Sequence, residues 1–212
     1  MRLTNETLET FSRRLASADP APGGGSSAAA EAALGIGLIT MAAAVSAEKR
    51  EYTHRKEELA GIIETAGRLR QRLLSLVDAD AAAYAALMAA RGIRNAEDRR
   101  RALEEAVQGA VLAPYHILSA ALDGLRLAQD LAKDYYPPTA SDVGLGAQSL
   151  LASARGAELT ILINLPGLAD SALKQRYRRD SQAMLGQAAA LAGAVYAETR
   201  RKLLEKTGTD SP

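Results

Sequence analysis

Two aspartates interrupt the apolar stripe of a long helical pattern, residues 53–91, and their chemistry needs an explanation. Asp80 takes a position that the stripe assigns to the core, and Asp78 lies on an adjoining inward-facing track. A buried carboxylate is costly unless it is paired or put to use, and such groups tend to have raised pKa values. The pattern leaves three interpretations open: acid/base catalysis, pairing with an arginine of a neighbouring helix, or a kink that exposes the carboxylates.

A third carboxylate, Asp142, follows a stiff turn. Pro137 and Pro138 must lie in a loop, and a helix then begins near Thr139, three residues before Asp142. This spacing resembles a capping box, which would explain Asp142 without any function. Alternatively, the two prolines hold the carboxylate in a fixed place for catalysis.

Near the N-terminus, two prolines and three consecutive glycines precede a run of small residues. We expect Ser26 or Ser27 to cap the helix that follows. Its exposed N–H groups would attract an anion, and the glycines Gly23, Gly24 and Gly25 would leave room for a flat ligand. Three glycines in a row suggest that another group approaches this backbone closely.

Other polar residues point to a site less specifically. Asn164 is an amide within an apolar run, and it could either bind a ligand or satisfy the carboxyl end of its helix. His54 and His116 are isolated, and the chain has no cysteine. We therefore expect no metal site. The glycines do not follow a strand, so they do not indicate dinucleotide binding.

The elements that carry these residues are all predicted to be helices. Residues 4–18, 27–49, 53–91, 95–133, 139–163 and 171–206 show helical periodicity, and Pro114 predicts a kink or break in the fourth of these segments. No strand pattern or internal repeat is present. The sequence predicts an all-α fold, a single domain over residues 1–212 that forms an antiparallel bundle of about six long helices, with residues 207–212 frayed.

The composition of the chain argues against two kinds of partner, nucleic acid and membrane. With 26 basic and 25 acidic side chains the net charge is +1, so nucleic-acid binding is not expected. Residues 28–47 could span a membrane by length, but Glu31 and the many Ala and Gly residues favour a buried soluble helix. No membrane association is therefore expected. The lack of cysteine and of an apolar N-terminal signal fits a cytoplasmic location. The all-round apolarity of residues 27–49 and the length of the third helix predict a homodimer.

Five stretches, in this order, resemble the cyclodeaminase/cyclohydrolase family, which includes the C-terminal domain of formiminotransferase-cyclodeaminase and stand-alone methenyltetrahydrofolate cyclohydrolases. The similarity covers residues 8–200, and the joint order of the motifs is more specific than any one of them. The stretches are Ala21-Pro22-Gly23-Gly24-Gly25-Ser26, Lys49-Arg50-Glu51-Tyr52, residues 76–84 around Asp78 and Asp80, Ser141-Asp142-Val143, and Ile161-Leu162-Ile163-Asn164-Leu165.

The resemblance implies a helical dimer that holds a tetrahydrofolate derivative near the subunit interface, without a metal or a bound redox cofactor. The family either closes 5-formiminotetrahydrofolate with loss of ammonia or interconverts 5,10-methenyl- and 10-formyltetrahydrofolate. The resemblance implies that Asp142 is the leading acid/base residue and that Asp80 and Asp78 support it. The implied substrate-binding residues are Gly23, Gly24, Gly25, Ser26, Lys49, Arg50, Tyr52, Ser141 and Asn164. A formiminotransferase is the implied partner.

The chain departs from the family pattern at Glu31, Glu48, Tyr136 and Thr160, where the family commonly has small or amide residues. These positions lie in or beside the expected site elements. Two alternatives therefore stand beside the folate enzyme: a divergent member that acts on another amidine or cyclic imine, and a non-catalytic helical dimer that binds a ligand.

Overall fold

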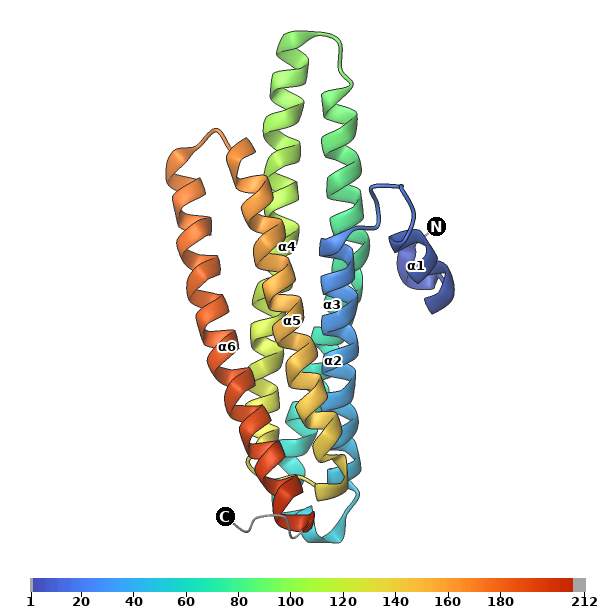
Figure 1. The fold of residues 1–212 in the computed structure, drawn as a ribbon, viewed down its shortest axis with the longest axis vertical. Coiled ribbons are helices and arrows are strands. Elements are labelled where there is room, and N and C mark those ends of the chain that lie inside the picture. Colours follow the sequence, from blue (N-terminus) through green and yellow to red (C-terminus); the bar gives the residue numbers. More distant parts are fainter. Residues whose placement is uncertain (1, 208–212) are drawn as a thin grey trace.

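The long helices of the described chain, α2 to α6, run along a common axis, and the short helix α1 lies beside them (Figure 1). This computed structural model describes residues 2–207, and no strand occurs among them. The α-helices are α1 Leu8–Leu15, α2 Gly24–Ala47, α3 Lys56–Arg91, α4 Ala96–Ala132, α5 Ala140–Asn164 and α6 Ser171–Thr207. The 3₁₀ turns are Leu3–Asn5, Arg50–Arg55, Pro137–Thr139 and Leu165–Gly167. The all-α bundle of about six helices is confirmed. Of the residues predicted to fray, 207–212, Thr207 is the last residue of α6, and 208–212 lie outside the described range.

The predicted cap of α2 is wrong, and of the kink or break predicted at Pro114 the break does not occur. α2 begins at Gly24 with Gly23 as its N-cap, so neither Ser26 nor Ser27 caps it. The glycines form the first helical turn because the backbone there must pass close to another group, as described below. α4 continues through Pro114 without a break, and Pro114 is buried. Packing of α4 against α3, α5 and α6 therefore outweighs the hydrogen bond that proline removes.

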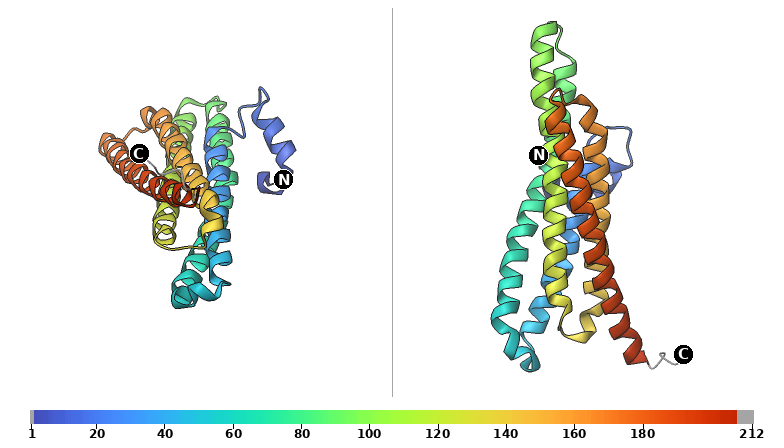
Figure 2. Two further views of the ribbon diagram at one scale, coloured as in Figure 1. Left: turned by 60° about the horizontal axis from the view of Figure 1, so that its bottom comes forward. Right: turned by 90° about the vertical axis from the view of Figure 1, so that its left-hand side faces the viewer.

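The capping of α4 agrees with its sequence. The Oδ1 atom of Asn95 accepts hydrogen bonds from the backbone N–H groups of Glu97 and Asp98, at 2.9 and 3.1 Å. The two acidic residues also lie in the first turn, where the helix dipole favours them. This cap turns the chain back sharply after α3, and the α3–α4 pair extends beyond the rest of the bundle (Figure 2).

α2 packs between α3 and α5 and also contacts α4, but its outer face is exposed, so the central position that its small residues predict is wrong. Its crossing with α5 depends on two glycines. A Cβ atom added at Gly35 would lie 2.9 Å from the carbonyl oxygen of Gly146, and one added at Gly146 would lie 2.8 Å from that of Gly35. Both distances are shorter than van der Waals contact, and both obstacles are backbone atoms.

We expect Gly35→Ala to lower the free energy of unfolding by about 2 kcal/mol, because the two helices must move apart to admit a methyl group. Chemical denaturation followed by circular dichroism measures this change. Gly37→Ala is the matched control, since no heavy atom lies within 4 Å of its added Cβ. An equal loss in both variants would show that the contact between α2 and α5 is not the cause.

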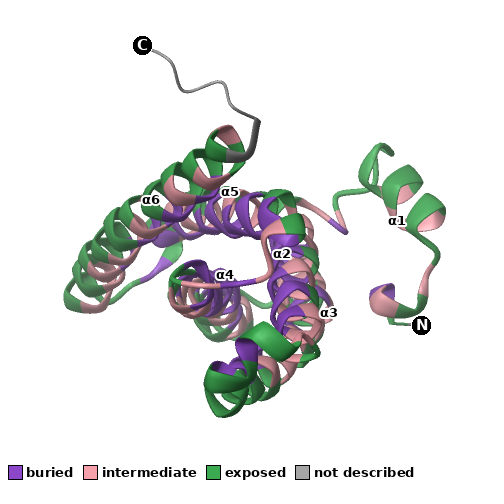
Figure 3. Cartoon of the chain, turned by 90° about the horizontal axis from the view of Figure 1, so that it is seen from below, coloured by how far each residue is buried: buried purple, intermediate pink, exposed green. Residues whose placement is uncertain are grey.

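α1 does not join the core (Figure 3). The apolar residues of the N-terminal segment are buried to different extents: Leu3 is buried, Phe11 is half-buried, and the side chain of Leu8 is 78% exposed. With Leu34 of α2, these residues line an apolar groove of about 530 Å³. The N-terminal segment is therefore attached to the bundle mainly through polar contacts with α3, described with Asp78 below.

Two helical segments, Gly24–Ala47 and Arg50–Arg91, are long and apolar enough to cross a membrane by length and composition. Half of the apolar window of the first segment and 28% of that of the second are buried inside the chain. Core helices of a bundle meet the same criterion. The absence of membrane association stays a prediction, and the unburied part of α2 is an apolar surface that needs an explanation.

Candidate active site

A cavity of about 410 Å³ lies at the end of the bundle where α2 begins and α5 ends. The glycine loop forms one wall, α3 forms a second, and the last turns of α5 form a third. Its lining includes four groups expected from the sequence: Gly23, Gly24 and Gly25, Asp80, Thr160 and Asn164. The structure therefore brings together residues from three distant parts of the chain.

Asp80 lies where α3 passes the first turn of α2. The hydroxyl of Ser26 donates a hydrogen bond to Oδ2 of Asp80 at 2.9 Å, and the backbone N–H of Ser26 also donates to this carboxylate. Burial raises the pKa of Asp80 above its ordinary value, and the hydrogen bonds from Ser26 oppose this rise only in part. A half-buried carboxylate with a raised pKa beside a cavity is suited to accept and return a proton.

The group that approaches the glycines is the carboxylate of Asp80. A Cβ atom added at Gly25 would lie 2.1 Å from Oδ1 of Asp80, whereas none of the surrounding atoms lies within 4 Å of a Cβ added at Gly24. The amino end of α2 attracts an anion, as the sequence predicts, but that anion belongs to the protein. Gly24 is exposed and lines the cavity, so its side of the loop remains open to a ligand.

Gly25→Ala should therefore lower turnover by about tenfold or more, because the new methyl group displaces the carboxylate of Asp80 from Ser26. The stability loss should be only on the order of 1 kcal/mol, since Asp80 can rotate away at the loss of its hydrogen bonds. Gly24→Ala controls for helix propensity, which alanine improves equally at both positions. Parallel activity assays and thermal melts separate the two variants; equal activities would contradict the role of the contact.

Asn164 has the structural role that its sequence left open, and it also faces the cavity. Its amide nitrogen donates to the carbonyl oxygen of Thr160 in α5 at 2.8 Å and to that of Ala110 in α4 at 3.1 Å. The second carbonyl lacks its usual helical donor because residue 114 is a proline. Asn164 also lines the cavity. Its Oδ1 atom accepts no hydrogen bond from any described residue and remains able to accept one from a ligand N–H.

The sequence reasoning missed Tyr84 and Arg91, which also line the cavity. Together with Asp80 and Leu87 they are spaced at i, i+4, i+7 and i+11, which places all four on one face of α3. The signal was present in the sequence, because Asp80 and Tyr84 were already assigned to one stripe. The residues after Asp80 on this stripe were interpreted as part of the core. In the structure Leu87 is buried, whereas Tyr84 is half-buried and Arg91 is exposed.

Asp78 binds the N-terminal segment of the chain. It accepts hydrogen bonds from the backbone N–H of Leu3 at 2.6 Å, from Nε of Arg2 at 3.1 Å and from the hydroxyl of Thr4 at 3.2 Å. Burial alone would raise the pKa of Asp78, but these hydrogen bonds outweigh burial and lower it. Its carboxylate anchors the N-terminal segment to α3, which matches the arginine-pairing interpretation and places it outside the cavity lining.

The remaining candidate residues lie at the opposite end of the bundle. Asp142 is in the first turn of α5, whereas Asn164 is in its last turn, and a helix of this length separates them by roughly 33 Å. Lys49, Arg50 and Tyr52 follow the carboxyl end of α2 and lie at the same end as Asp142. A single chain therefore does not place Asp142 next to Asp80, and the expected site is divided into two clusters.

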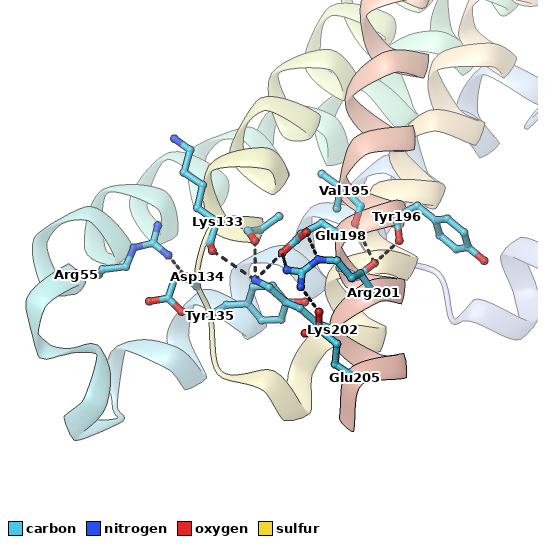
Figure 4. Close-up of polar contacts among 12 residues, drawn as sticks. Arg55, Lys133, Asp134, Tyr135, Val195, Tyr196, Glu198, Arg201, Lys202 and Glu205 are labelled. Carbon is cyan, nitrogen blue, oxygen red and sulfur yellow. Dashed lines mark hydrogen bonds and ion pairs between the residues drawn. The ribbon is translucent and has the colours of Figure 1, made fainter. Parts of the chain in front are cut away.

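The turn before Asp142 is held from several sides, at the bundle end shown in Figure 4. Lys202 of α6 donates to the carbonyl oxygen of Ala132 at 2.9 Å and lies over the ring of Tyr135, 4.4 Å from its centroid. The hydroxyl of Tyr52 donates to the carbonyl oxygen of Tyr135 at 2.8 Å, so Tyr52 is structural here. Burial raises the pKa of Tyr135 to about 12.

The capping-box interpretation of Asp142 is wrong. Thr139 makes no capping hydrogen bond through its side chain, and its hydroxyl instead donates to the carbonyl oxygen of Tyr136 at 2.8 Å. Asp142 is half-buried and accepts no hydrogen bond from a described residue. Lys49 lies 4.6 Å from the ring centroid of Tyr136, whereas Arg50 and Ser141 are exposed. This end therefore presents unpaired polar groups on a rigid turn.

Glu31 and Glu48, two of the residues that depart from the family pattern, lie away from the cavity. Glu31 is half-buried on α2, and burial raises its pKa, but it is not part of the cavity lining. Glu48 is exposed at the other end of the same helix. Neither carboxylate therefore opposes an anionic ligand in the cavity. Within residues 2–207, no three acidic or histidine side chains gather as a metal site would require.

A helical bundle with an end cavity, a half-buried carboxylate and an open amide oxygen fits a protein that binds a small molecule, but this geometry does not identify the molecule. The sequence pattern of the formiminotransferase-cyclodeaminase family matches residues 7–183. The chain therefore belongs to this family. The match includes both clusters of candidate residues.

Individual proteins of this family are similar to the chain over most of its length. The chain is 30% identical over 204 residues to methenyltetrahydrofolate cyclohydrolase of Methylorubrum extorquens, covering 94% of this chain and 98% of that protein. It is 32% identical over 198 residues to formimidoyltransferase-cyclodeaminase of Rattus norvegicus, but it spans only 37% of that longer protein. The crystal structure of formiminotetrahydrofolate cyclodeaminase from Thermotoga maritima has the same fold, with a TM-score of 0.78, 23% identity and coverage of 96% of this chain and 98% of that one.

Proposed function

We propose that this chain is a folate-dependent one-carbon enzyme, either a formiminotetrahydrofolate cyclodeaminase or a methenyltetrahydrofolate cyclohydrolase. The observation that carries this proposal is the position of Asp80, a carboxylate with a raised pKa that lies beside a cavity of substrate size. Family membership and the names of two relatives support the substrate class. The divergent-substrate and ligand-binding alternatives lack a comparable observation.

Both reactions require proton transfer at a tetrahedral carbon between two folate nitrogens. In ring closure, N10 attacks the formimino carbon, loses its proton, and the protonated amino group departs as ammonia. In hydrolysis, water attacks the methenyl carbon, and one ring nitrogen regains a proton as its bond to carbon breaks. Asp80 takes the proton from the nucleophile and returns it to the leaving nitrogen. Ser26 orients this carboxylate, and Gly23 and Gly24 leave space for the flat pterin.

The active form proposed here is a homodimer. The outer faces of α2 and α5 lie side by side and expose large apolar side chains along the whole bundle, which is more than a monomer usually shows. These side chains are Leu34, Met41, Leu145, Leu159 and Ile163. Ile163 also lines the cavity, so the apolar face reaches the candidate active site.

A second copy explains the divided site. If the two-fold axis is perpendicular to the bundle, the face of one copy meets the reversed face of its partner. The cavity end of one chain, with Asp80, then lies beside the end of the partner that carries Asp142, Lys49 and Arg50. Each active site would thus combine both clusters, with Asp142 as a second acid/base group. A formimidoyltransferase, fused in the longer relatives, would supply the substrate if the chain is the deaminase.

The reaction is tested by following the absorbance of 5,10-methenyltetrahydrofolate with purified protein. Hydrolysis removes the methenyl chromophore, whereas deamination of 5-formiminotetrahydrofolate produces it. We expect turnover in one of these assays and folate binding in isothermal calorimetry. Absence of turnover in both, together with absence of binding, would overturn the proposed function.

A further inference from the structure

Among the residues that line the cavity, two are charged, and they lie at different distances from the glycine loop. Asp80 lies against the first turn of α2, and Arg91 is in the last turn of α3. Because an α-helix rises about 1.5 Å per residue, Arg91 lies roughly 16 Å beyond Asp80 along the same helix face. The cavity therefore has a carboxylate where the proton transfer is proposed and a guanidinium at its other end.

The surface between the two charges suits a flat aryl group. Tyr84 and Leu87 occupy the intermediate positions of the same face of α3, and Ile163 of α5 also lines this cavity. Tyr84 is half-buried and Leu87 is buried. An aromatic ring of a ligand can pack on such side chains while its polar ends reach the two charged residues.

Arg91 has no polar partner in the described part of the chain. Its side chain is exposed and makes no ion pair or hydrogen bond with a described residue, in contrast to Arg55, Arg101, Arg126 and Arg201, which pair with acidic side chains. An arginine in the last turn of a helix also interacts favourably with the helix dipole, and this is the structural alternative. The guanidinium presents several N–H donors in a geometry that matches a carboxylate.

We infer that Arg91 binds the carboxylate of the glutamyl tail of the substrate and so sets the preference for substrates that carry this tail. The inference rests on the proposed function, because it uses the same cavity and places the one-carbon centre at Asp80. The aryl ring then lies over Tyr84 and Leu87, and the glutamyl group reaches the end of α3. Arg91 is a binding residue in this arrangement and takes no part in proton transfer.

The test compares Arg91→Ala with wild type on two substrates, methenyltetrahydrofolate and the methenyl derivative of tetrahydropteroate, which lacks the glutamate. With the complete substrate, we expect the variant to raise KM by about tenfold to a hundredfold with little change in kcat, as loss of a charge-assisted hydrogen bond predicts. With the pteroate substrate, wild type and variant should have the same KM. Arg94→Ala, an exposed arginine that does not line the cavity, should behave as wild type on both.

The outcomes separate this inference from the proposed function. No turnover of these substrates or of 5-formiminotetrahydrofolate by wild type, together with no folate binding, would overturn the function itself. If wild type acts only as the deaminase, the same comparison uses 5-formiminotetrahydrofolate and its pteroate analogue. Turnover by wild type with an unchanged KM in Arg91→Ala would overturn only the role of Arg91. An equal rise in KM for both substrates, or a lower melting temperature without a substrate-dependent effect, would assign Arg91 to structure and contradict the inference. Rescue of KM by Arg91→Lys to an intermediate value would support it.

Discussion

Asp80→Asn should lower turnover by about a hundredfold or more while the bundle stays folded, because the amide can still accept the hydrogen bond of Ser26 but cannot take a proton. Initial rates of the methenyltetrahydrofolate assay measure this loss. Asp78→Asn is the matched control, since it makes the same change two residues away. Asp78 anchors the N-terminal segment through Arg2, Leu3 and Thr4 and lies outside the cavity lining.

The two variants should also differ in stability, and with opposite pH dependence. The pKa of Asp80 is raised in the folded chain, so its ionisation destabilises the fold as pH rises from the ordinary carboxyl value through the raised one. Asp80→Asn removes this cost and should be at least as stable as wild type at pH 7. The pKa of Asp78 is lowered, so its contribution is present above the ordinary value and is lost in acid.

Asp78→Asn should therefore cost about 1–3 kcal/mol at pH 7, and the difference from wild type should shrink as pH falls through the lowered pKa. Urea denaturation at several pH values measures both effects. Large loss of activity in Asp78→Asn with normal rates in Asp80→Asn would reverse the assignment made here. Loss of stability and activity together in Asp80→Asn would show that its carboxylate is structural.

Mixing two inactive variants should restore activity if each active site spans two chains. Asp80→Asn and Asp142→Asn each inactivate both sites of their own homodimer. In a mixed dimer, one site combines the intact Asp80 of one chain with the intact Asp142 of the other. Random pairing at equal amounts should then recover roughly a quarter of wild-type activity. Co-expression with two purification tags isolates the mixed dimer directly.

If each active site lies within one chain, mixing the two variants should not restore activity. Mixed dimers would then show no more activity than the separate variants. As a further control, Asp80→Asn mixed with Gly25→Ala should show no gain over the residual activity of the separate variants, because both changes affect the same cluster. A monomer in light scattering at micromolar concentration would contradict the dimer itself, and would leave Asp142 roughly 30 Å from the cavity along α5.

The helical periodicity and the small residues of α2 were enough to predict most of the fold. Periodicity depends on local sequence, and Gly35 and Gly146 allow the close helix crossing that the small residues indicate. The start of α2 was misplaced because Gly23 and Gly24 are poor helix formers by intrinsic propensity. Contact between Gly25 and Asp80, a tertiary effect, decides that the helix begins there.

The candidate site was harder to predict. The sequence identified Asp80 because an acid in an apolar stripe is a local anomaly, and it could not distinguish Asp80 from Asp78, which differ only in the distant residues that they contact. It grouped Asp142 with Asp80 through the family resemblance, but sequence order does not state which end of a bundle a residue occupies. The cytoplasmic location and the absence of nucleic-acid and membrane partners stay predictions.

The most direct test of the central claim is a crystal structure of the Asp80→Asn variant with methenyltetrahydrofolate, because slow turnover should preserve the substrate. The account predicts density for the pterin beside Gly23 and Gly24, with the one-carbon centre within hydrogen-bond reach of the side chain at position 80 and the glutamyl carboxylate at Arg91. Folate bound away from the side chain at position 80, with the cavity between α2, α3 and α5 empty, would contradict it.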